Sequence, residues 1–198
     1  QERYDLADAD YQKMIELKPG ETMGYMGIGR NANAQKRWDD AIKQFDYVTK
    51  LANDYSSGYS FRAESYIGKE EWTEATDDIV KALSLDWDRK ALYLANTLKE
   101  PAFTMLVSKI KVQSAKSPNE ATWPYITGTM YEQSKQYTKA IEYYETANSK
   151  DVSPVIHQRI SECHYELGDY EDALNSINQA LNLDSTDLSY KARKANIY

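Results

Sequence analysis

The chain has 198 residues and a formal net charge of −7, with 31 Asp and Glu against 24 Lys and Arg. This balance disfavours binding to nucleic acid and adsorption to anionic membranes, because both depend on clustered Lys and Arg. The single cysteine, Cys163, excludes an internal disulfide and a metal site built from several cysteines, and no run of about 18 apolar residues is present to span a membrane.

Large, small and large side chains recur along the chain with a period of about 34 residues. The first expected helix, within residues 2–17, carries Tyr4, Ala7 and Tyr11. The equivalent positions of the next two repeats are Trp38, Ala41 and Phe45, then Trp72, Ala75 and Ile79. Spacings of three and four residues place each set on one stripe of a helix. The pattern therefore predicts a series of amphipathic helices, which we name B helices.

The same pattern continues through the second half of the chain at slightly shorter steps. Its large first positions are Phe103, Tyr137 and Tyr170, followed by Leu106, Ala140 and Ala173. A second helix, the A helix, precedes each B helix, and one of its positions holds only small residues: Gly29, Ala63, Thr97, Gly128 and Ser161. Such a column is expected where two helices approach too closely for a larger side chain.

Together these helix pairs resemble the tetratricopeptide repeat, whose A helix reads W-x2-L-G-x2-Y and whose B helix reads A-x3-F before a closing Pro. The residues that carry the resemblance include Tyr25, Ile28, Gly29 and Ala32 in one A helix, Ala41 and Phe45 in the following B helix, and Pro19 and Pro118 at the closing position. The resemblance implies an all-α fold, a right-handed α-α superhelical solenoid of stacked antiparallel helix pairs.

The repeats predict one continuous array of twelve helical segments over residues 1–198, without a strand. Its parts are 1–21 (a half repeat, helix B only), the repeats 22–55, 56–89, 90–120, 121–153 and 154–187, and 188–198 (the start of a further helix A). The fourth repeat lacks three residues before Pro101, which we interpret as a local distortion and not as a domain boundary. The half repeats suggest a piece of a larger protein, with further repeats or a catalytic domain elsewhere.

The residues that could carry chemistry have structural explanations. His157 and His164 lie two helical turns apart, about 10 Å of rise, which is too far for one metal ion bound by a single helix. Gly24, Gly27 and Gly29 superficially resemble a phosphate loop, but they fall within an A helix and follow no predicted strand. No catalytic motif is present. We therefore expect no enzyme activity, no cofactor and no metal, and we expect Cys163 to be a buried apolar residue.

The resemblance also implies a concave groove lined by the A helices, with ligand contacts at the second, fifth, ninth and twelfth positions of each repeat. Carried onto this chain, the predicted contacts are Met23, Met26, Arg30, Asn33, Ser60, Glu64, Ile67, Leu94, Tyr125, Thr129, Glu132, Gln158, Glu162 and Tyr165. A subclass of the family grips chaperone C-terminal tails through Lys and Asn on successive A helices. That pattern is missing here, so a chaperone tail is not expected as the ligand.

We therefore predict a non-catalytic scaffold that binds a peptide or protein segment along its concave face. The charged contacts are mostly acidic (Glu64, Glu132 and Glu162 against Arg30), and apolar residues lie between them, so the partner should have apolar anchors and at least one basic side chain. Two alternatives stay open. The chain could be an accessory repeat domain of a larger enzyme or of a secretion or assembly component, or it could associate with itself through the ends of the array.

Overall fold

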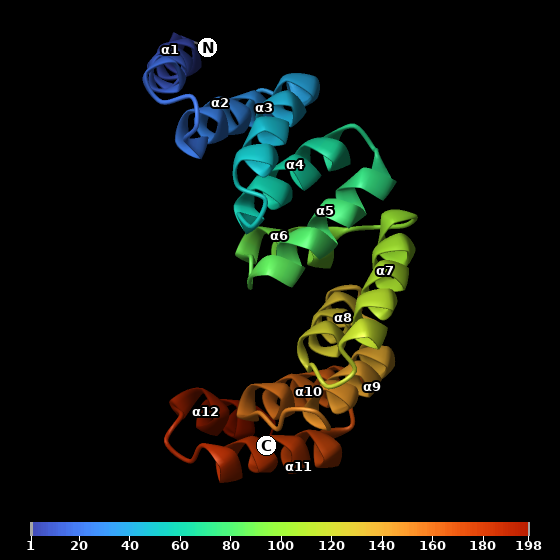
Figure 1. Cartoon of the computed structure of the whole chain (residues 1–198). Coiled ribbons are helices and arrows are strands. Elements are labelled where there is room, and N and C mark those ends of the chain that lie inside the picture. Colours follow the sequence, from blue (N-terminus) through green and yellow to red (C-terminus); the bar gives the residue numbers. More distant parts are fainter. Residues whose placement is uncertain (1, 198) are drawn as a thin grey trace. The chain divides into compact units, whose positions relative to one another are not determined.

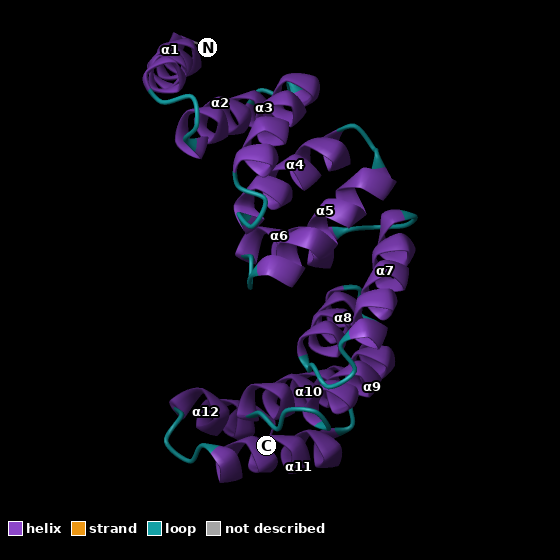
Figure 2. Cartoon of the chain, in the orientation of Figure 1, coloured by secondary structure: helices purple, strands orange, loops and turns teal. Residues whose placement is uncertain are grey.

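The structure is a computed structural model that describes residues 2–197, and every regular element in that range is a helix (Figure 2). The twelve α-helices are α1 (Glu2–Leu17), α2 (Thr22–Ala34), α3 (Trp38–Leu51), α4 (Ser56–Gly68), α5 (Trp72–Leu85), α6 (Arg89–Thr97), α7 (Ala102–Lys116), α8 (Thr122–Gln133), α9 (Tyr137–Asn148), α10 (Pro154–Leu167), α11 (Tyr170–Leu183) and α12 (Leu188–Ile197). The described residues confirm the all-α prediction and the expected twelve helices.

The chain forms two compact units, Gln1–Lys109 (unit 1) and Ile110–Tyr198 (unit 2), with the boundary inside α7. Within unit 1, each helix from α1 to α6 packs against the next, and within unit 2 the same holds from α8 to α12 (Figure 1). Even-numbered helices are the A helices and odd-numbered ones the B helices. Each unit is therefore a stack of antiparallel helix pairs, while a single array from end to end stays a prediction.

The turn from the A helix to the B helix has the same backbone in four repeats. One residue in each turn has a left-handed backbone: Lys36 (φ 58°), Glu70 (φ 60°), Lys135 (φ 58°) and Gly168 (φ 85°). The next residue donates its N–H to a carbonyl five residues earlier, as Arg37 does to Ala32. This bond closes the A helix in the manner of a Schellman motif. The turn recurs although three of the four residues are not glycine, which indicates that helix packing imposes it.

The core of each unit lies between A and B helices, where the predicted columns meet. The alanine column is fully buried, at 0% exposure for Ala41, Ala75, Ala140 and Ala173. The large residues four positions later are equally covered: Phe45, Ile79, Tyr144 and Ile177. Burial of both columns confirms that each of these B helices turns one stripe toward the core.

The size of the A-helix residue follows the size of the B-helix residue that faces it. A Cβ atom added at Gly29 would lie 2.6 Å from the ring of Phe45, and one added at Gly128 would lie 2.6 Å from the ring of Tyr144. The equivalent pairs, with the same separation of 16 residues, are Ala63 with Ile79 and Ser161 with Ile177. Glycine thus stands opposite an aromatic ring, and a slightly larger residue stands opposite isoleucine.

We predict that Gly29→Ala lowers the free energy of unfolding, measured by urea denaturation. The added methyl group would be forced against the Phe45 ring, and overpacking of this kind costs about 1–3 kcal/mol. Gly20→Ala is the matched control, because a Cβ at Gly20 meets no atom within 4 Å. Combining Gly29→Ala with Phe45→Ile reproduces the Ala63 and Ile79 pairing, so the double variant should lose less stability than the two single losses added together. Strict additivity would contradict the size matching.

Candidate functional site

In unit 1 the predicted contact residues differ widely in accessibility. Met23 and Arg30 are exposed, and Glu64 and Ile67 are half-buried. The remaining four are buried: Met26, Asn33, Ser60 and Leu94. A partner can touch the accessible four directly, whereas the buried four shape the surface from beneath.

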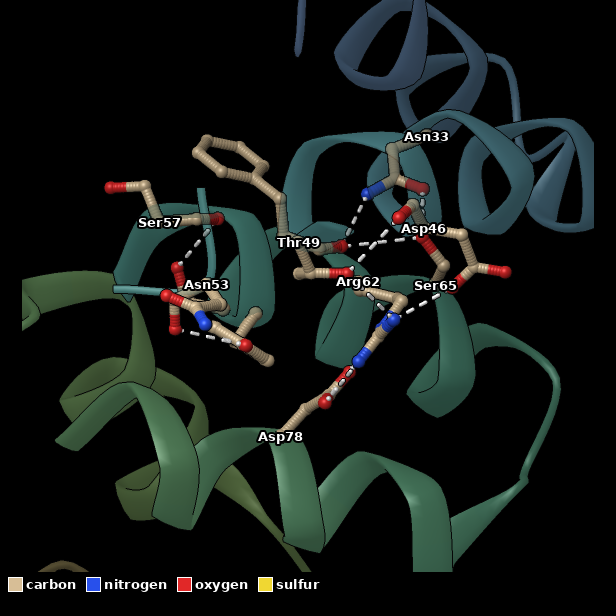
Figure 3. Close-up of polar contacts among 11 residues, drawn as sticks. Asn33, Asp46, Thr49, Asn53, Ser57, Arg62, Ser65 and Asp78 are labelled. Atoms are coloured by element: carbon tan, nitrogen blue, oxygen red, sulfur yellow. Dashed lines mark hydrogen bonds and ion pairs between the residues drawn. The ribbon is translucent and has the colours of Figure 1, made fainter. Parts of the chain in front are cut away.

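Two of these residues, Asn33 and Glu64, belong to a polar network that connects successive A helices. Figure 3 shows Asn33 and Ser65 of this network. The Asn33 side-chain nitrogen donates to Glu64 and to the backbone oxygen of Phe61, both at 3.0 Å, and its oxygen accepts from Ser65 at 2.6 Å. Glu64 also pairs with Lys90 on α6 at 2.9 Å. The amide and the carboxylate therefore already hold α2, α4 and α6 in register.

Arg62 on α4 connects the B helices on either side of it (Figure 3). Its guanidinium donates two hydrogen bonds of 2.8 Å to the carboxylate of Asp78 on α5. It donates two more to α3, one to Asp46 at 2.6 Å and one to Thr49 at 3.1 Å. The hydrogen bonds to Asp78 raise the pKa of Arg62 above its ordinary value. The planar fork matches the carboxylate, so both bonds to Asp78 form at once.

Aromatic rings complete this arginine site. The ring centres of Tyr59 and Tyr66 lie 5.5 Å and 5.9 Å from the central carbon of the Arg62 guanidinium. The site is not among those predicted from the sequence. The sequence feature that could have revealed it is the charged residue Arg62 at a repeat position that holds an uncharged residue in other repeats: Ile28, Thr127 and Ile160.

In unit 2 the structure brings together predicted residues from α8 and α10. Arg159 pairs with Glu132 at 3.3 Å and with Glu162 at 3.2 Å, and Gln158 donates to Glu162 at 3.1 Å. The buried Tyr144 hydroxyl donates a hydrogen bond to Glu132. Burial raises the pKa of this phenol, which keeps it a donor. Glu132 and Glu162 therefore lie side by side on neighbouring A helices.

The other predicted residues of unit 2 lie on the same two A helices, α8 and α10. Thr129 is buried and donates to the backbone oxygen of Ile126 at 2.8 Å. Tyr125 is half-buried, with its ring centre 5.6 Å from that of Tyr144. Tyr165 is also half-buried. The two tyrosines thus leave part of their rings accessible.

An open hollow of about 410 Å³, which we name the A-face hollow, lies beside the two carboxylates. Its lining residues are Glu132, Gln133, Lys135, Tyr137, Glu162, Glu166 and Arg193. The Arg193 guanidinium, from α12, lies 4.6 Å from the ring centre of Tyr165, and its covered Nε makes no hydrogen bond. Glu166 accepts a hydrogen bond of 3.5 Å from Tyr137. Tyr137, Glu166 and Arg193 are not among the predicted contacts, because none stands at a contact position of the family.

The two histidines occupy the side of α10 that faces the B helices. His157 is buried, and burial lowers its pKa. His164 is half-buried, with Nδ1 3.8 Å from Asp169. Among residues 2–197, no group of three or more His, Cys, Asp or Glu side chains is placed to hold a metal ion. No helix in that range has the length and apolar character needed to cross a membrane.

Comparison with known proteins gives a family match in unit 2. Residues 131–197 match the family described as the tetratricopeptide repeat. Two curated relatives from Drosophila melanogaster, Hsc70-interacting protein 1 and Hsc70-interacting protein 2, are each 30% identical over 90 residues, which is 46% of this chain and 24% of the relative. The chain thus spans about a quarter of the length of these relatives.

Solved structures, two of them described as tetratricopeptide repeat proteins, are similar to the chain over most of its length. TTC0263 of Thermus thermophilus is 18% identical, with a TM-score of 0.45, covering 99% of this chain and 91% of its own. YrrB, described as having an unusual peptide-binding site, is 15% identical, with a TM-score of 0.48, covering 93% of this chain and 97% of its own. MamA is 18% identical, with a TM-score of 0.44, covering 98% of this chain and 91% of its own.

We predict that Cys163 does not react with a thiol reagent in the native protein. The side chain is buried, and burial raises the pKa of its thiol to about 12, so almost no reactive thiolate exists at pH 8. Ellman's reagent should release no rapid signal from the native chain and one equivalent after denaturation in urea. Ser84→Cys, at an exposed position of α5, should add one rapidly reacting thiol. Rapid labelling of the native wild-type chain would contradict the burial.

Proposed function

We propose that the chain, whose residues 131–197 match the tetratricopeptide repeat family, binds a protein or peptide segment through the A-face hollow of unit 2 and through Tyr125 and Tyr165 on the same A helices. Repeats of this family serve generally as protein–protein interaction scaffolds. The observation that carries the proposal is the convergence of Glu132 and Glu162, from separate A helices, on one open hollow. This is a pre-formed surface, so binding would not require the scaffold to become ordered.

The lining of the hollow favours a basic side chain of the partner. Three carboxylates line it, from Glu132, Glu162 and Glu166, against two cationic side chains, Lys135 and Arg193. Arg159 pairs with the first two, whereas Glu166 is exposed and accepts the long hydrogen bond from Tyr137. A basic side chain would therefore gain most from Glu166 and from the unfilled lone pairs of Glu162.

Apolar contacts support the second part of the proposal, an apolar or aromatic anchor next to the basic residue. Arg193, which lines the hollow, lies over the ring of Tyr165, so this ring is compatible with a neighbouring guanidinium. Tyrosine is frequent among the residues that dominate interfaces, because a large rigid ring gives contact area at a low entropic cost. In unit 1, the exposed Met23 offers a flexible apolar contact of the same kind.

The names of the Drosophila relatives add a specific candidate. Those proteins are called Hsc70-interacting, so an Hsc70 chaperone is a folded protein worth testing against this surface. The missing Lys and Asn pattern argues against capture of an acidic chaperone tail. The alternative function, an accessory domain that positions an enzyme or an assembly component outside this chain, would use the same surface. We propose no catalytic role for the repeats themselves.

We predict that selection of phage-displayed random peptides on the chain enriches sequences with Lys or Arg next to an apolar residue. The double variant Glu162→Gln with Glu166→Gln should weaken the selected peptides about three- to tenfold and reduce the salt dependence of binding, because it removes partly exposed charges. Tyr165→Ala should weaken them about tenfold or more, mainly by faster dissociation. Surface plasmon resonance measures both rates.

Glu142→Gln is the matched control for these variants, since Glu142 is an exposed glutamate of α9 that does not line the hollow. It should leave the affinity unchanged. Peptides that bind both the double variant and Tyr165→Ala as tightly as the wild type would show that the A-face hollow is not the binding site. Selection of peptides without a basic residue would exclude the proposed partner chemistry.

A further inference from the structure

A second hollow in unit 2, of about 450 Å³, lies between α9, α10 and α11, and we name it the B-side hollow. Its lining residues are Glu145, Asn148, Ser149, His157, Ile160, His164, Asp172, Asn175, Ser176 and Gln179. It shares no lining residue with the A-face hollow. Its two carboxylates, from Glu145 and Asp172, are not balanced by any Lys or Arg in the lining.

The repeats themselves supply a comparison for this hollow. When the third repeat and the B helix before it are aligned with the sixth repeat and the B helix before it, by their B-helix columns, the Arg62 site falls on the B-side hollow. The aligned pairs are Asp46 with Glu145, Thr49 with Asn148, Tyr59 with His157, Arg62 with Ile160, Tyr66 with His164, and Asp78 with Ser176. Equivalent helices surround both places: α3, α4 and α5 around Arg62, and α9, α10 and α11 around the B-side hollow. In each case these are two B helices and the A helix between them.

The two places differ mainly in what fills them. In the third repeat, the long Arg62 side chain occupies the space and bonds to both B helices. In the sixth repeat, the shorter and uncharged Ile160 leaves the space open, and the smaller Ser176 stands where Asp78 would be. Two features of the arginine site remain, namely a carboxylate on the preceding B helix (Glu145) and a flat ring on each side (His157 and His164).

We propose that the B-side hollow binds an arginine side chain of a partner protein, in the place that Arg62 fills in the third repeat. A guanidinium can donate several hydrogen bonds in one plane and can stack against flat rings. The hollow offers matching acceptors in the carboxylates of Glu145 and Asp172 and in the side-chain oxygens of Asn148 and Ser176.

The test is a titration of the whole chain with N-acetyl-arginine amide, followed by proton NMR of the imidazole rings. The chain has only two histidines, and both line the hollow, so their signals report on this place alone. We expect saturable shifts of both rings. N-acetyl-norleucine amide, which keeps the apolar stem without the guanidinium, should produce none. Absence of saturable shifts with the arginine probe, or equal shifts with both probes, would overturn the proposal.

Variants distinguish binding in the B-side hollow from binding to the surrounding surface. Glu145→Gln with Asp172→Asn should weaken the arginine probe about three- to fivefold, because both carboxylates are partly screened by solvent. Glu171→Gln, an exposed neighbour on α11 outside the lining, should leave the affinity unchanged. Equal affinities for the two variants would overturn the proposal.

A variant in which the B-side hollow is filled from within provides an independent test. Ile160→Arg with Ser176→Asp rebuilds the pairing of Arg62 with Asp78 inside the sixth repeat, and it should abolish the shifts caused by the arginine probe. Circular dichroism confirms that the variant stays helical. Retained binding by the folded double variant would show that the probe binds elsewhere, and the proposal would be wrong.

Discussion

Close contact between a small A-helix residue and a large B-helix residue is the constraint on which the other features of the repeats depend. At Gly29 and Gly128 the ring of the B helix lies where a Cβ atom would be. Interdigitation at this distance fixes the register of one helix on the other, since a shift by one residue would bring a larger side chain against the ring. Once that register is fixed, the opposite side of each A helix is left to face outward. The positions of Glu132, Glu162 and Tyr165 follow from it.

The same packing of helices encloses different side chains in different repeats. In the third repeat, the space between successive B helices contains Arg62 and two carboxylates, and a charge there tolerates burial only because its hydrogen bonds are satisfied. In the sixth repeat, the equivalent space is open and polar. The backbone turns and buried columns are alike in both, so the difference lies in a few side chains and not in the fold. Variation of this kind is how a repeated scaffold acquires distinct binding surfaces.

Periodic features of the structure were predictable from the sequence, and contacts between repeats were not. The helices and the buried columns follow from local spacing, because residues three and four apart share a helix face. The solvent accessibility of the predicted groove residues could not be derived from their positions within the repeat. Asn33 is buried because Ser65, Phe61 and Glu64 of the next A helix bond to it. Arg193 reaches Tyr165 from the following A helix. Such contacts depend on which side chains face one another across the boundary between two repeats. The spacing of the repeats along the sequence does not specify those pairs.

Helix α10 contributes to both hollows of unit 2 from different sides. Glu162 and Glu166 line the A-face hollow, whereas His157, Ile160 and His164 line the B-side hollow. A helix repeats its faces every 3.6 residues, so these sets cannot exchange places without rotation of α10. The contact of Ser161 with α11, where its hydroxyl donates to the backbone oxygen of Ala173 at 2.8 Å, opposes such a rotation. The packing of α10 against α11 therefore keeps two chemically different surfaces apart on one helix.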